Sequence, residues 1–407
     1  LRELANAIKS VSFAKNLEKA ADSLEANGIK VLFAENAADA RECILQICRQ
    51  KNARNVVKIK SMTTEEIELN QFLAENGLDA VETDLGELII QLEHEHPSHI
   101  VKPAIHRRRE DIAASFEKHS IAPYDDEPSH ITLNARKYLR KKYFEADVVI
   151  SGANYVLAEE GAIVLATNEG NARFSMPGAK THIAIAGFEK VIPSARELAV
   201  FLNLLGRSAT AQNSTVYTDF VAGAGLAKNS PQEMFVIFLD NGRSDILKSE
   251  FSDILKCGAC MNRCPVFRLV GGHAYRAVYP GPLGIVLSPL LAGADIAKFA
   301  DLPKACSLCG KCADVCPAKI PLPDLILKMR DKIKKAQIPV PNDINFKPWA
   351  FFASSPKLWR TLMPLNKIAN LFPLDAIKIG PLGRWLKFRT LPKFNGGDFR
   401  KWFNKNG

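Results

Sequence analysis

The sequence predicts a layered α/β domain, followed by a smaller α-helical domain rich in cysteine and by a basic, aromatic tail. Short apolar segments alternate with helical patterns over residues 1–243, and this alternation is typical of a largely parallel sheet. Seven of the nine cysteines lie between residues 257 and 316, and all four tryptophans follow residue 341. We therefore place the domains at residues 1–243, 244–338 and 339–407.

The composition is that of a soluble globular protein. The chain has 407 residues, of which 47% are hydrophobic and 24% charged, so two or three folded domains are expected and disorder is not. No apolar run reaches the roughly 18 to 20 residues of a membrane span. The first residues, Leu1-Arg-Glu-Leu-Ala, lack the pattern of a signal peptide. We expect a cytoplasmic, reducing location.

The first domain begins with a helix, a strand and a second helix. Leu17, Ala20 and Leu24 have helical spacing, residues 28–34 form an apolar segment typical of a buried strand, and a helical pattern resumes over residues 39–48. Cys43 and Cys48 lie on this second helix, and we interpret them as core residues rather than ligands. Further strands are predicted at residues 55–59, 80–83, 147–150, 162–166, 181–187 and 234–239.

Four polar segments interrupt this pattern. Residues 61–66 combine a Ser hydroxyl with carboxylates four and five residues later, which predicts a capped helix start. Residues 84–87 are expected to form a turn, and residues 167–173 a polar loop. The histidines of residues 94–99 could bind zinc, but we favour a polar loop in which they form local hydrogen bonds.

Polar residues gather where the predicted strands between residues 147 and 192 end. Ligand sites of parallel sheets lie at the carboxyl ends of the strands, so these residues predict a pocket for a small polar or anionic ligand. Turn chemistry alone would also explain them, and both interpretations stay open at this point. The candidate ligand-binding residues are Asn154, Glu159, Asn168, Glu169, Asn171 and Arg173.

The spacing of the cysteines indicates iron–sulfur clusters. The second of the two runs has the C-x2-C-x2-C-x3-C-P spacing of bacterial ferredoxins, in which the fourth cysteine binds the neighbouring 4Fe-4S cluster. Structural zinc takes four ligands, usually in two pairs, and disulfides are rare in reducing compartments, so both alternatives fit seven cysteines less well. The predicted metal ligands are Cys257, Cys260 and Cys264 in the first run, and Cys306, Cys309, Cys312 and Cys316 in the second.

Crossed ligation predicts two unequal sites. One 4Fe-4S site would be completed by Cys306, Cys309, Cys312 and Cys264. The other would be held by Cys257, Cys260 and Cys316 alone, because the expected fourth position is Ile254, which cannot bind iron. This three-cysteine site is a 3Fe-4S cluster, a 4Fe-4S cluster with an unusual fourth ligand, or a cube open to a partner. We favour a 4Fe-4S cluster with one labile iron.

The segments around the cysteines are expected to support the clusters. Residues 244–255 predict a helix that leads into the first run. Residues 265–305 are rich in glycine and proline and predict a rigid loop that wraps the clusters and excludes water. A helix is expected from Asp324 to about Ala336, with the aspartate at its positive end.

The tail is basic and aromatic. From residue 341 to the end, twelve lysines and arginines face three aspartates, a net charge of +9 that is nearly the whole +10 of the chain. Such a segment is expected to dock on a partner subunit or to lie peripherally on the inner face of the cell membrane. A nucleic-acid contact or a simple packing arm is less favoured. The tryptophans are Trp349, Trp359, Trp385 and Trp402.

Several stretches resemble a known family. Residues 61–66, 83–87, 96–100 and 152–171 look like the lactate-utilization (LUD) domain. With the cysteine runs and the Gly- and Pro-rich segment 271–282, the whole chain resembles the iron–sulfur B subunit of the bacterial three-protein L-lactate oxidation system.

The resemblance implies a sugar-isomerase/CoA-transferase-like fold for the first domain. It also implies electron transfer from lactate oxidation to pyruvate towards a respiratory acceptor, with a cysteine-rich subunit and a small LUD-domain subunit as partners. No residue of this chain is assigned to C–H cleavage. Two rivals stay open: a CoA-transferase-like enzyme acting through Glu159 or Glu160, and an adaptor for another 2-hydroxy-acid oxidase such as glycolate oxidase.

Overall fold

A computed structural model describes residues 13–226, 229–251, 257–338, 347–371 and 398–406, together with isolated positions between 380 and 393. The chain divides into two compact units, Leu1–Val340 and Pro341–Gly407. Two positions used above, Ile254 and Trp385, lie outside the described residues. Below, the α/β domain means residues 13–251 and the cluster-binding region means residues 257–338.

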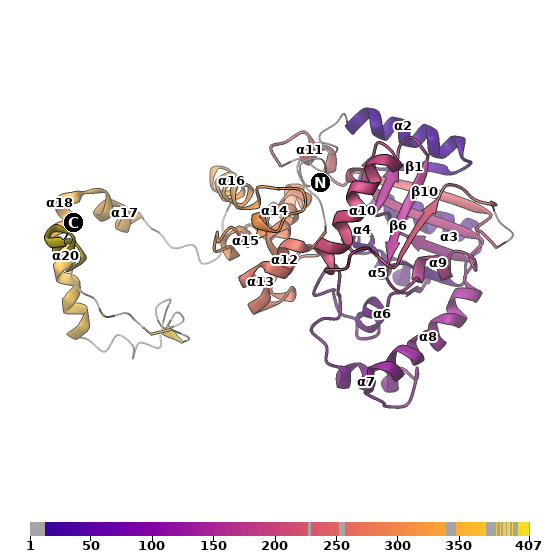
Figure 1. Ribbon diagram of the computed structural model, residues 1–407, viewed down its shortest axis with the longest axis horizontal. Coiled ribbons are helices and arrows are strands. Elements are labelled where there is room, and N and C mark those ends of the chain that lie inside the picture. Colours follow the sequence, from indigo (N-terminus) through magenta and orange to yellow (C-terminus); the bar gives the residue numbers. More distant parts are fainter. Residues whose placement is uncertain are drawn as a thin grey trace. The chain divides into compact units, whose positions relative to one another are not determined.

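The α/β domain contains two sheets (Figure 1). Its strands are β1 (Lys30–Ala34), β2 (Val56–Lys58), β3 (Ala80–Glu82), β4 (Val148–Ser151), β5 (Tyr155–Leu157), β6 (Ala162–Thr167), β7 (Thr181–Gly187), β8 (Val191–Ile192), β9 (Tyr217–Val221) and β10 (Glu233–Leu239). One sheet has six strands in the order β1-β10-β7-β4-β2-β3 and is parallel throughout. The other has the order β8-β5-β6-β9, with β6 antiparallel to both of its neighbours.

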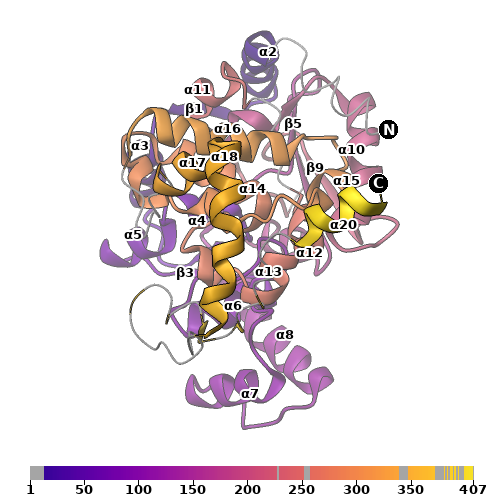
Figure 2. The same ribbon diagram turned by 90° about the vertical axis from the view of Figure 1, so that its left-hand side faces the viewer.

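Helices alternate with the strands along the chain. They are α2 (Phe13–Ala26), α3 (Ala37–Gln50), α4 (Met62–Glu66), α5 (Leu69–Glu75), α6 (Leu85–Leu92), α7 (Arg109–Lys118), α8 (Pro128–Glu145), α9 (Asn171–Ser175), α10 (Ala195–Ala209) and α11 (Arg243–Leu247), with a 3-10 turn η1 (Phe188–Lys190). Figures 1 and 2 show α7 and α8 extending together away from the sheets.

The layers follow from the alternation of side chains along each buried strand. On β4, Val148 and Ile150 belong to the apolar core shared with α3 and α5, whereas Val149 belongs to the core shared with α2 and the second sheet. The opposite face of the second sheet packs on α10, where the rings of Tyr155 and Phe201 lie 5.3 Å apart. The domain is therefore built as helix, sheet, sheet, helix, as expected of an α/β layered protein with a largely parallel sheet.

Three local predictions were wrong. Residues 84–87 are not a turn: Asp84 caps α6, its side chain accepting the N–H groups of Gly86 and Glu87. The polar loop predicted for residues 167–173 already turns into α9 at Asn171. The helix predicted to run to residue 255 ends at Leu247, and residues 252–256 lie outside the described part of the chain.

The cluster-binding region is helical. It comprises α12 (Ala259–Arg263), α13 (Pro265–Val270), η2 (His273–Tyr275), α14 (Gly281–Leu291), η3 (Gly293–Phe299), η4 (Leu302–Ala305), α15 (Lys311–Asp314) and α16 (Leu322–Lys335). The prediction of a rigid loop between the cysteine runs was wrong, because this segment forms helices. Prolines occupy the first turns of two of them, α13 and α14. Proline is tolerated there, since those N–H groups have no partner within a helix. The predicted last helix corresponds to α16.

The second unit contains α17 (Lys347–Ser354), α18 (Pro356–Leu362), η5 (Met363–Leu371) and α20 (Asp398–Asn406). Within it, Lys367 forms an ion pair with Asp398 at 3.4 Å. Several of its large apolar side chains are exposed, among them Trp349, Phe399 and Trp402. Among the described residues, no helix is both long and apolar enough to cross a membrane.

Candidate iron–sulfur site and adjoining cavity

The two cysteine runs use the same backbone turn. Gly258 follows Cys257 with a φ of 80°, and Gly310 follows Cys309 with a φ of 78°. Only glycine adopts this conformation without strain. Each glycine precedes a short helix, α12 or α15, and these two helices pack against each other. The two runs therefore form loops of similar backbone conformation, which lie side by side because their helices pack together.

The seven cysteines of the two runs gather in and around one apolar core. Four of them, Cys260, Cys264, Cys312 and Cys316, are buried members of this core, and Cys306 packs against it. All seven are free thiols rather than disulfides. Seven thiols on two packed loops, five of them buried and none in a disulfide, fit iron–sulfur clusters, for which thiolates are the usual ligands.

Electrostatic influences show which thiols are neighbours. Burial raises the pKa of Cys260 to about 12, and Cys257, Cys312 and Cys316 add to the rise. Burial also raises the pKa of Cys312 to about 11, with Cys306 as the next contributor. Without metal these thiols keep their protons, so a bound cluster must displace them.

Across the core, the hydroxyl of Tyr275 is a neighbour of sulfurs from both runs. Its pKa is raised by burial and then by Cys264 of the first run, Cys306 of the second run and Cys260. Cys264 and Cys306 therefore approach the same side chain, although 41 residues separate the two runs' facing ends, Pro265 to Ala305. The last cysteine of the first run and the first of the second are therefore both close enough to the Tyr275 hydroxyl to raise its pKa.

Backbone N–H groups are directed at three of the sulfurs. Such donors stabilise thiolates and tune the potential of a cluster. One of them requires Leu308 to adopt a φ of 55°, an uncommon conformation for a bulky residue. The bonds are Phe267 N–H to Cys264 Sγ at 3.5 Å, Leu308 N–H to Cys306 Sγ at 3.3 Å and Ile320 N–H to Cys316 Sγ at 3.3 Å.

The histidine-containing loop of the α/β domain docks on the cluster-binding region. Gly272 N–H donates to Ser98 Oγ at 3.3 Å, and a Cβ at this glycine would lie 1.8 Å from the Ser98 carbonyl oxygen. His99 accepts the N–H of Val101 at Nδ1, which leaves the proton on Nε2 to donate to Asn262 Oδ1 at 3.1 Å. The bond with Val101 is local, as expected for this segment, whereas the bond to Asn262 makes His99 a bridge between the two parts.

A buried ion network forms a second bridge. The Arg243 guanidinium donates to both carboxylate oxygens of Glu66 at 2.8 Å and to Glu189 Oε2 at 2.7 Å. Burial opposes the charge, but Glu189 and Glu66 together hold the pKa of Arg243 well above its usual range. Tyr279 of the cluster-binding region donates to Glu66 at 2.7 Å. The Tyr279 hydroxyl of the cluster-binding region is therefore part of the buried ion network of the α/β domain.

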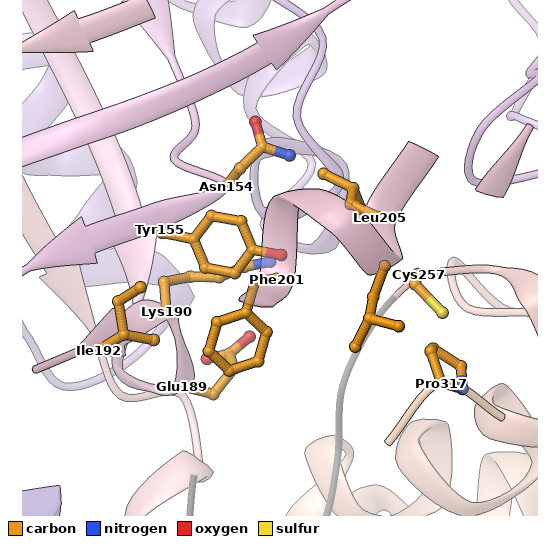
Figure 3. A pocket seen from close by; sticks show the side chains of 10 residues that line it. Asn154, Tyr155, Glu189, Lys190, Ile192, Phe201, Leu205, Cys257 and Pro317 are labelled. Carbon is orange, nitrogen blue, oxygen red and sulfur yellow. The ribbon is translucent and has the colours of Figure 1, made fainter. Parts of the chain in front are cut away.

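A cavity of about 400 Å³, called the large cavity below, opens at the carboxyl ends of β2, β4 and β6. Residues after these strands form most of its wall, and Cys257 and Tyr279 contribute from the cluster-binding region. A smaller cavity of about 30 Å³ adjoins it and shares Asn154, Lys190 and Cys257. Figure 3 shows the Cys257 sulfur directed toward Pro317, with Tyr155 and Lys190 on the opposite side.

The large cavity collects four of the six predicted pocket residues. They are Asn154, Asn168, Glu169 and Asn171. The other two lie elsewhere. Glu159 is exposed at the far end of β5 with Lys19 as its ion-pair partner at 3.9 Å, and Arg173 bonds Asp219 at 2.8 Å.

Charged side chains of both signs line the large cavity. The cations are Lys60, Lys102 and Lys190, and the carboxylates are Asp84 and Glu169. Although part of its side chain reaches solvent, burial and the charge of Asp84 raise the pKa of Glu169 to about 7. At neutral pH the cavity wall is therefore more cationic than a simple count of its charged residues suggests.

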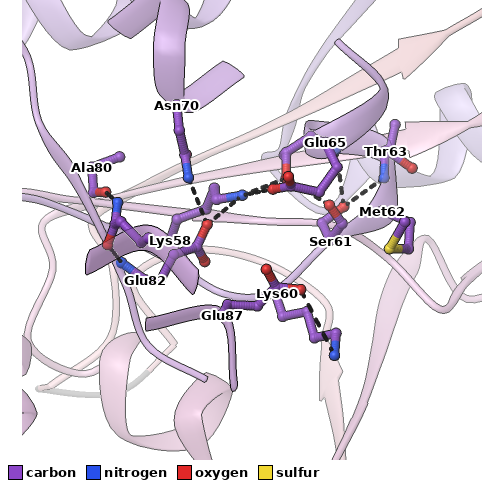
Figure 4. Close-up of polar contacts among 12 residues, drawn as sticks. Lys58, Lys60, Ser61, Met62, Thr63, Glu65, Asn70, Ala80, Glu82 and Glu87 are labelled. Atoms are coloured by element: carbon purple, nitrogen blue, oxygen red, sulfur yellow. Dashed lines mark hydrogen bonds and ion pairs between the residues drawn. The ribbon is translucent and has the colours of Figure 1, made fainter. Parts of the chain in front are cut away.

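A fully buried lysine, Lys58, ends β2 just before Ile59 and Lys60, which line the large cavity (Figure 4). The Lys58 ammonium contacts Glu65 Oε1 at 2.8 Å and Glu82 Oε1 at 2.7 Å. Burial alone would lower the pKa of Lys58, but the two glutamates raise it. Glu87 lies beside them, and its pKa is raised well above the usual range by burial and by Glu82. The sequence analysis missed this group, although a lysine within an apolar strand was a usable signal.

Three families match successive parts of the chain. Residues 17–240 match the LUD domain, residues 255–320 the 4Fe-4S dicluster domain, and residues 328–407 the family described as lactate utilisation protein B, C-terminal.

Curated relatives match over nearly the full length. The uncharacterized electron transport protein YkgF of Escherichia coli is 41% identical over 96% of this chain and 84% of the relative. Lactate utilization protein B of Bacillus velezensis is 42% identical, and that of Bacillus subtilis 40%, each over 95% of this chain and 83% of the relative. A solved structure of a DUF162 family protein from Deinococcus radiodurans aligns with a TM-score of 0.33 at 15% identity, covering 56% of this chain and 99% of that one. This last similarity is too weak to support an argument.

Proposed function

Because the chain belongs to the lactate utilization protein B family, we propose that it is the iron–sulfur electron-transfer subunit of a multi-protein system that oxidises L-lactate to pyruvate. The dicluster match and the electron-transport relative support electron transfer. The relatives named lactate utilization protein B support lactate as the electron source. The observation that carries the proposal is the burial of two facing cysteine loops in one core.

The ligand sets follow the crossed pattern. A 4Fe-4S cluster is held by Cys306, Cys309, Cys312 and Cys264, and the influence of both Cys264 and Cys306 on the pKa of Tyr275 supports this set. A second cluster, of the 4Fe-4S type with one labile iron, is held by Cys257, Cys260 and Cys316, as crossed ligation requires. Cys257, Cys312 and Cys316 all lie near enough to Cys260 to raise its pKa. In both, the cysteines bind as thiolates, and the neighbouring N–H groups compensate their charge.

Two clusters suit the electron count of the reaction. Oxidation of L-lactate to pyruvate releases two electrons and two protons, and each cluster exchanges one electron at a time. One molecule of this chain could therefore hold both electrons before passing them towards a respiratory acceptor. The chain's own residues bury five of the seven cysteines, whereas Cys306 is partly exposed and Cys309 is exposed.

We further propose a sugar-isomerase/CoA-transferase-like layering for the α/β domain, with domain boundaries after residues 243 and 338. The expected partners are a cysteine-rich subunit and a small LUD-domain subunit. The exposed aromatic and basic residues of the second unit would serve to dock this chain on a partner or at the inner face of the cell membrane.

The proposal is tested by anaerobic reconstitution. L-Lactate should reduce the clusters, seen as new EPR signals, only when the two partner proteins are present. Glycolate in place of lactate distinguishes an adaptor of another 2-hydroxy-acid oxidase. Glu159→Gln and Glu160→Gln variants should retain full lactate turnover, because neither residue lines the large cavity. Colourless, zinc-loaded protein would disprove the proposal.

A further inference from the structure

The large cavity lies where the α/β domain meets the cluster-binding region. Its wall comes almost entirely from the α/β domain, yet Cys257, a member of the three-cysteine set, also lines it. Its volume of about 400 Å³ falls within the range of small-molecule sites. A ligand in this cavity would therefore lie next to the cluster that Cys257 helps to hold.

The same cluster lacks one cysteine. Two 4Fe-4S clusters use eight thiolates, whereas the two runs supply seven. The remaining cysteines, Cys43 and Cys48, belong to α3 and pack in or against the core between α3 and the six-stranded sheet, so they are not part of the cluster site. One coordination position of the three-cysteine site is thus without a cysteine.

The chemistry of the wall selects an anion. Lys60 and Lys190 are partly buried in the cavity wall and Lys102 stands at its exposed side. The amide of Asn154 accepts the N–H of Ala166 at 2.9 Å through its oxygen, which orients the side chain and fixes which of its ends is the donor. The raised pKa of Glu169 leaves it partly protonated at neutral pH, which weakens its repulsion of a carboxylate.

We propose that the large cavity binds a small carboxylate, of the 2-hydroxy or 2-oxo acid class, between its lysines and the cluster held by Cys257, Cys260 and Cys316. The inference rests on the proposed function only in naming L-lactate and pyruvate as the ligands. It adds a site to a chain otherwise assigned electron transfer alone. The bound carboxylate would then lie next to the cluster site that has no fourth cysteine.

The test uses the isolated holoprotein without its partners. Binding of labelled pyruvate and L-lactate is measured by anaerobic equilibrium dialysis, and the EPR spectrum of the dithionite-reduced protein is recorded with and without each acid. Saturable binding together with a shift of the three-cysteine cluster's signal is expected. A Cys257→Ser variant identifies that signal, because it should abolish this signal and leave the other cluster's intact.

Asn154→Asp is the informative variant. The new carboxylate keeps the oxygen that accepts the Ala166 N–H, removes the amide donor and adds a negative charge, so the acids should bind at least about tenfold more weakly. Asn203→Asp is the matched control: it lies on the exposed side of α10, where its amide bonds the Ala199 carbonyl, and should bind normally. A Lys60→Gln variant should also bind more weakly while retaining a donor for the Val101 carbonyl.

Three outcomes would overturn the inference: absence of saturable binding, binding without any change of the cluster signal, and equal binding by Asn154→Asp and Asn203→Asp. Failure of the proposed function is seen separately. If the clusters are reduced by lactate only with the partners present, but the isolated holoprotein binds neither acid, the function stands and the site does not. If the acid binds and shifts the signal, while lactate never reduces the clusters even with the partners present, the site is supported and the proposed function is not.

Discussion

The hydroxyl of Tyr279 donates a 2.7 Å hydrogen bond to Glu66 Oε2, which joins the cluster-binding region to the α/β domain inside the protein. Glu66 belongs to the Ser-Met-Thr-Thr-Glu-Glu stretch and Tyr279 to the Tyr-Pro-Gly-Pro stretch, two of the motifs by which the sequence resembles its family. Their contact gives those motifs a physical reason: they hold the clusters against the carboxyl ends of the parallel strands.

Removing this hydrogen bond should loosen the junction. Tyr279→Phe keeps the buried ring but removes one of the two donors to Glu66 Oε2, which retains its bond from Arg243, so the free energy of unfolding should fall by about 1.5 to 3 kcal/mol, as for a hydrogen bond to a charged group. Chemical denaturation of the anaerobic protein, followed by cluster absorbance, measures the change. Tyr124→Phe, at a half-exposed position, should change stability by less than about 0.5 kcal/mol. Equal effects of both variants would contradict the prediction.

The buried lysine cluster predicts opposite results for two neighbouring residues. Lys58→Met leaves the buried carboxylate of Glu82 without its cation, and should cost about 3 to 5 kcal/mol of unfolding free energy. Glu87→Gln should be neutral or stabilising, because burial and Glu82 already favour the protonated form of Glu87, whose shape glutamine preserves. The midpoints of denaturant unfolding compare the two. A Glu87→Gln variant as unstable as Lys58→Met would show that Glu87 is charged in the folded protein.

Sequence spacing predicted the cluster loops well because their geometry is local. The pocket was predicted in part, and the direction of β5 explains which residues were missed. Asn154 precedes β5 and Asn168 follows β6, and since these strands are antiparallel, the start of one meets the end of the other at the cavity. Glu159 follows β5 and so lies at the opposite edge. Sequence analysis treated all strand ends as equivalent, which holds only for parallel strands.

Long-range pairing explains the other omissions. Arg173 was expected in the pocket, but α9 turns it toward Asp219 of β9, 46 residues later in the sequence. Gly272 was seen as a loop residue, whereas it is required by the close approach of the Ser98 carbonyl. Neither contact has a local signal, because each depends on a strand or loop that becomes a neighbour only after folding.

Stability should depend on pH through His182. This histidine is fully buried on β7, shares a 2.7 Å hydrogen bond with Ser151, and has its pKa lowered from 6.5 to about 4 by burial. Between these values the unfolded chain binds more protons than the folded one, so the stability contributed above pH 6.5 is lost as the pH falls toward 4. From pH 7 to pH 5 the free energy of unfolding should fall by on the order of 2 kcal/mol through this group.

Comparison with a variant isolates this contribution. His182→Gln retains a group that can bond Ser151 but does not titrate, so its stability relative to wild type should improve by about 2 kcal/mol between pH 7 and pH 5. Denaturation midpoints are compared at the two pH values, with cluster absorbance showing that both proteins keep their iron. Parallel pH profiles for wild type and variant would show that His182 is not the group responsible.

Single serine substitutions should reveal the crossed ligand sets. Cys264→Ser should lose the same EPR signal as Cys309→Ser, although these cysteines belong to different runs, and Cys316→Ser should match Cys257→Ser. Each should remove roughly half of the bound iron, measured by iron analysis. Cys43→Ser is the control, since this cysteine packs on the α3 core and should leave both signals intact. If Cys264→Ser instead matched Cys257→Ser, each run would bind its own cluster.

Exposed aromatic residues of α20 should bind a partner subunit. Phe399 and Trp402 lie one helical turn apart with their rings stacked at 5.9 Å, and both are more than half exposed, at 73% and 59%. Lys405, three residues after Trp402 on the same helix, is also exposed, and exposed aromatic residues of this kind are enriched at interfaces. A Phe399→Ser, Trp402→Ser double variant should bind the partner proteins at least about tenfold more weakly and keep its unfolding midpoint.

The matched control for this surface is Leu269→Ser, because Leu269 is 86% exposed but lies on α13 of the cluster-binding region. It should bind the partners as wild type does. Sedimentation with vesicles of anionic lipid tests the other expectation for the tail. If the double variant lost vesicle binding and kept its affinity for the partners, α20 would be a membrane contact. Such binding would weaken steeply with salt, because lysine and arginine near an anionic surface act through screened charge.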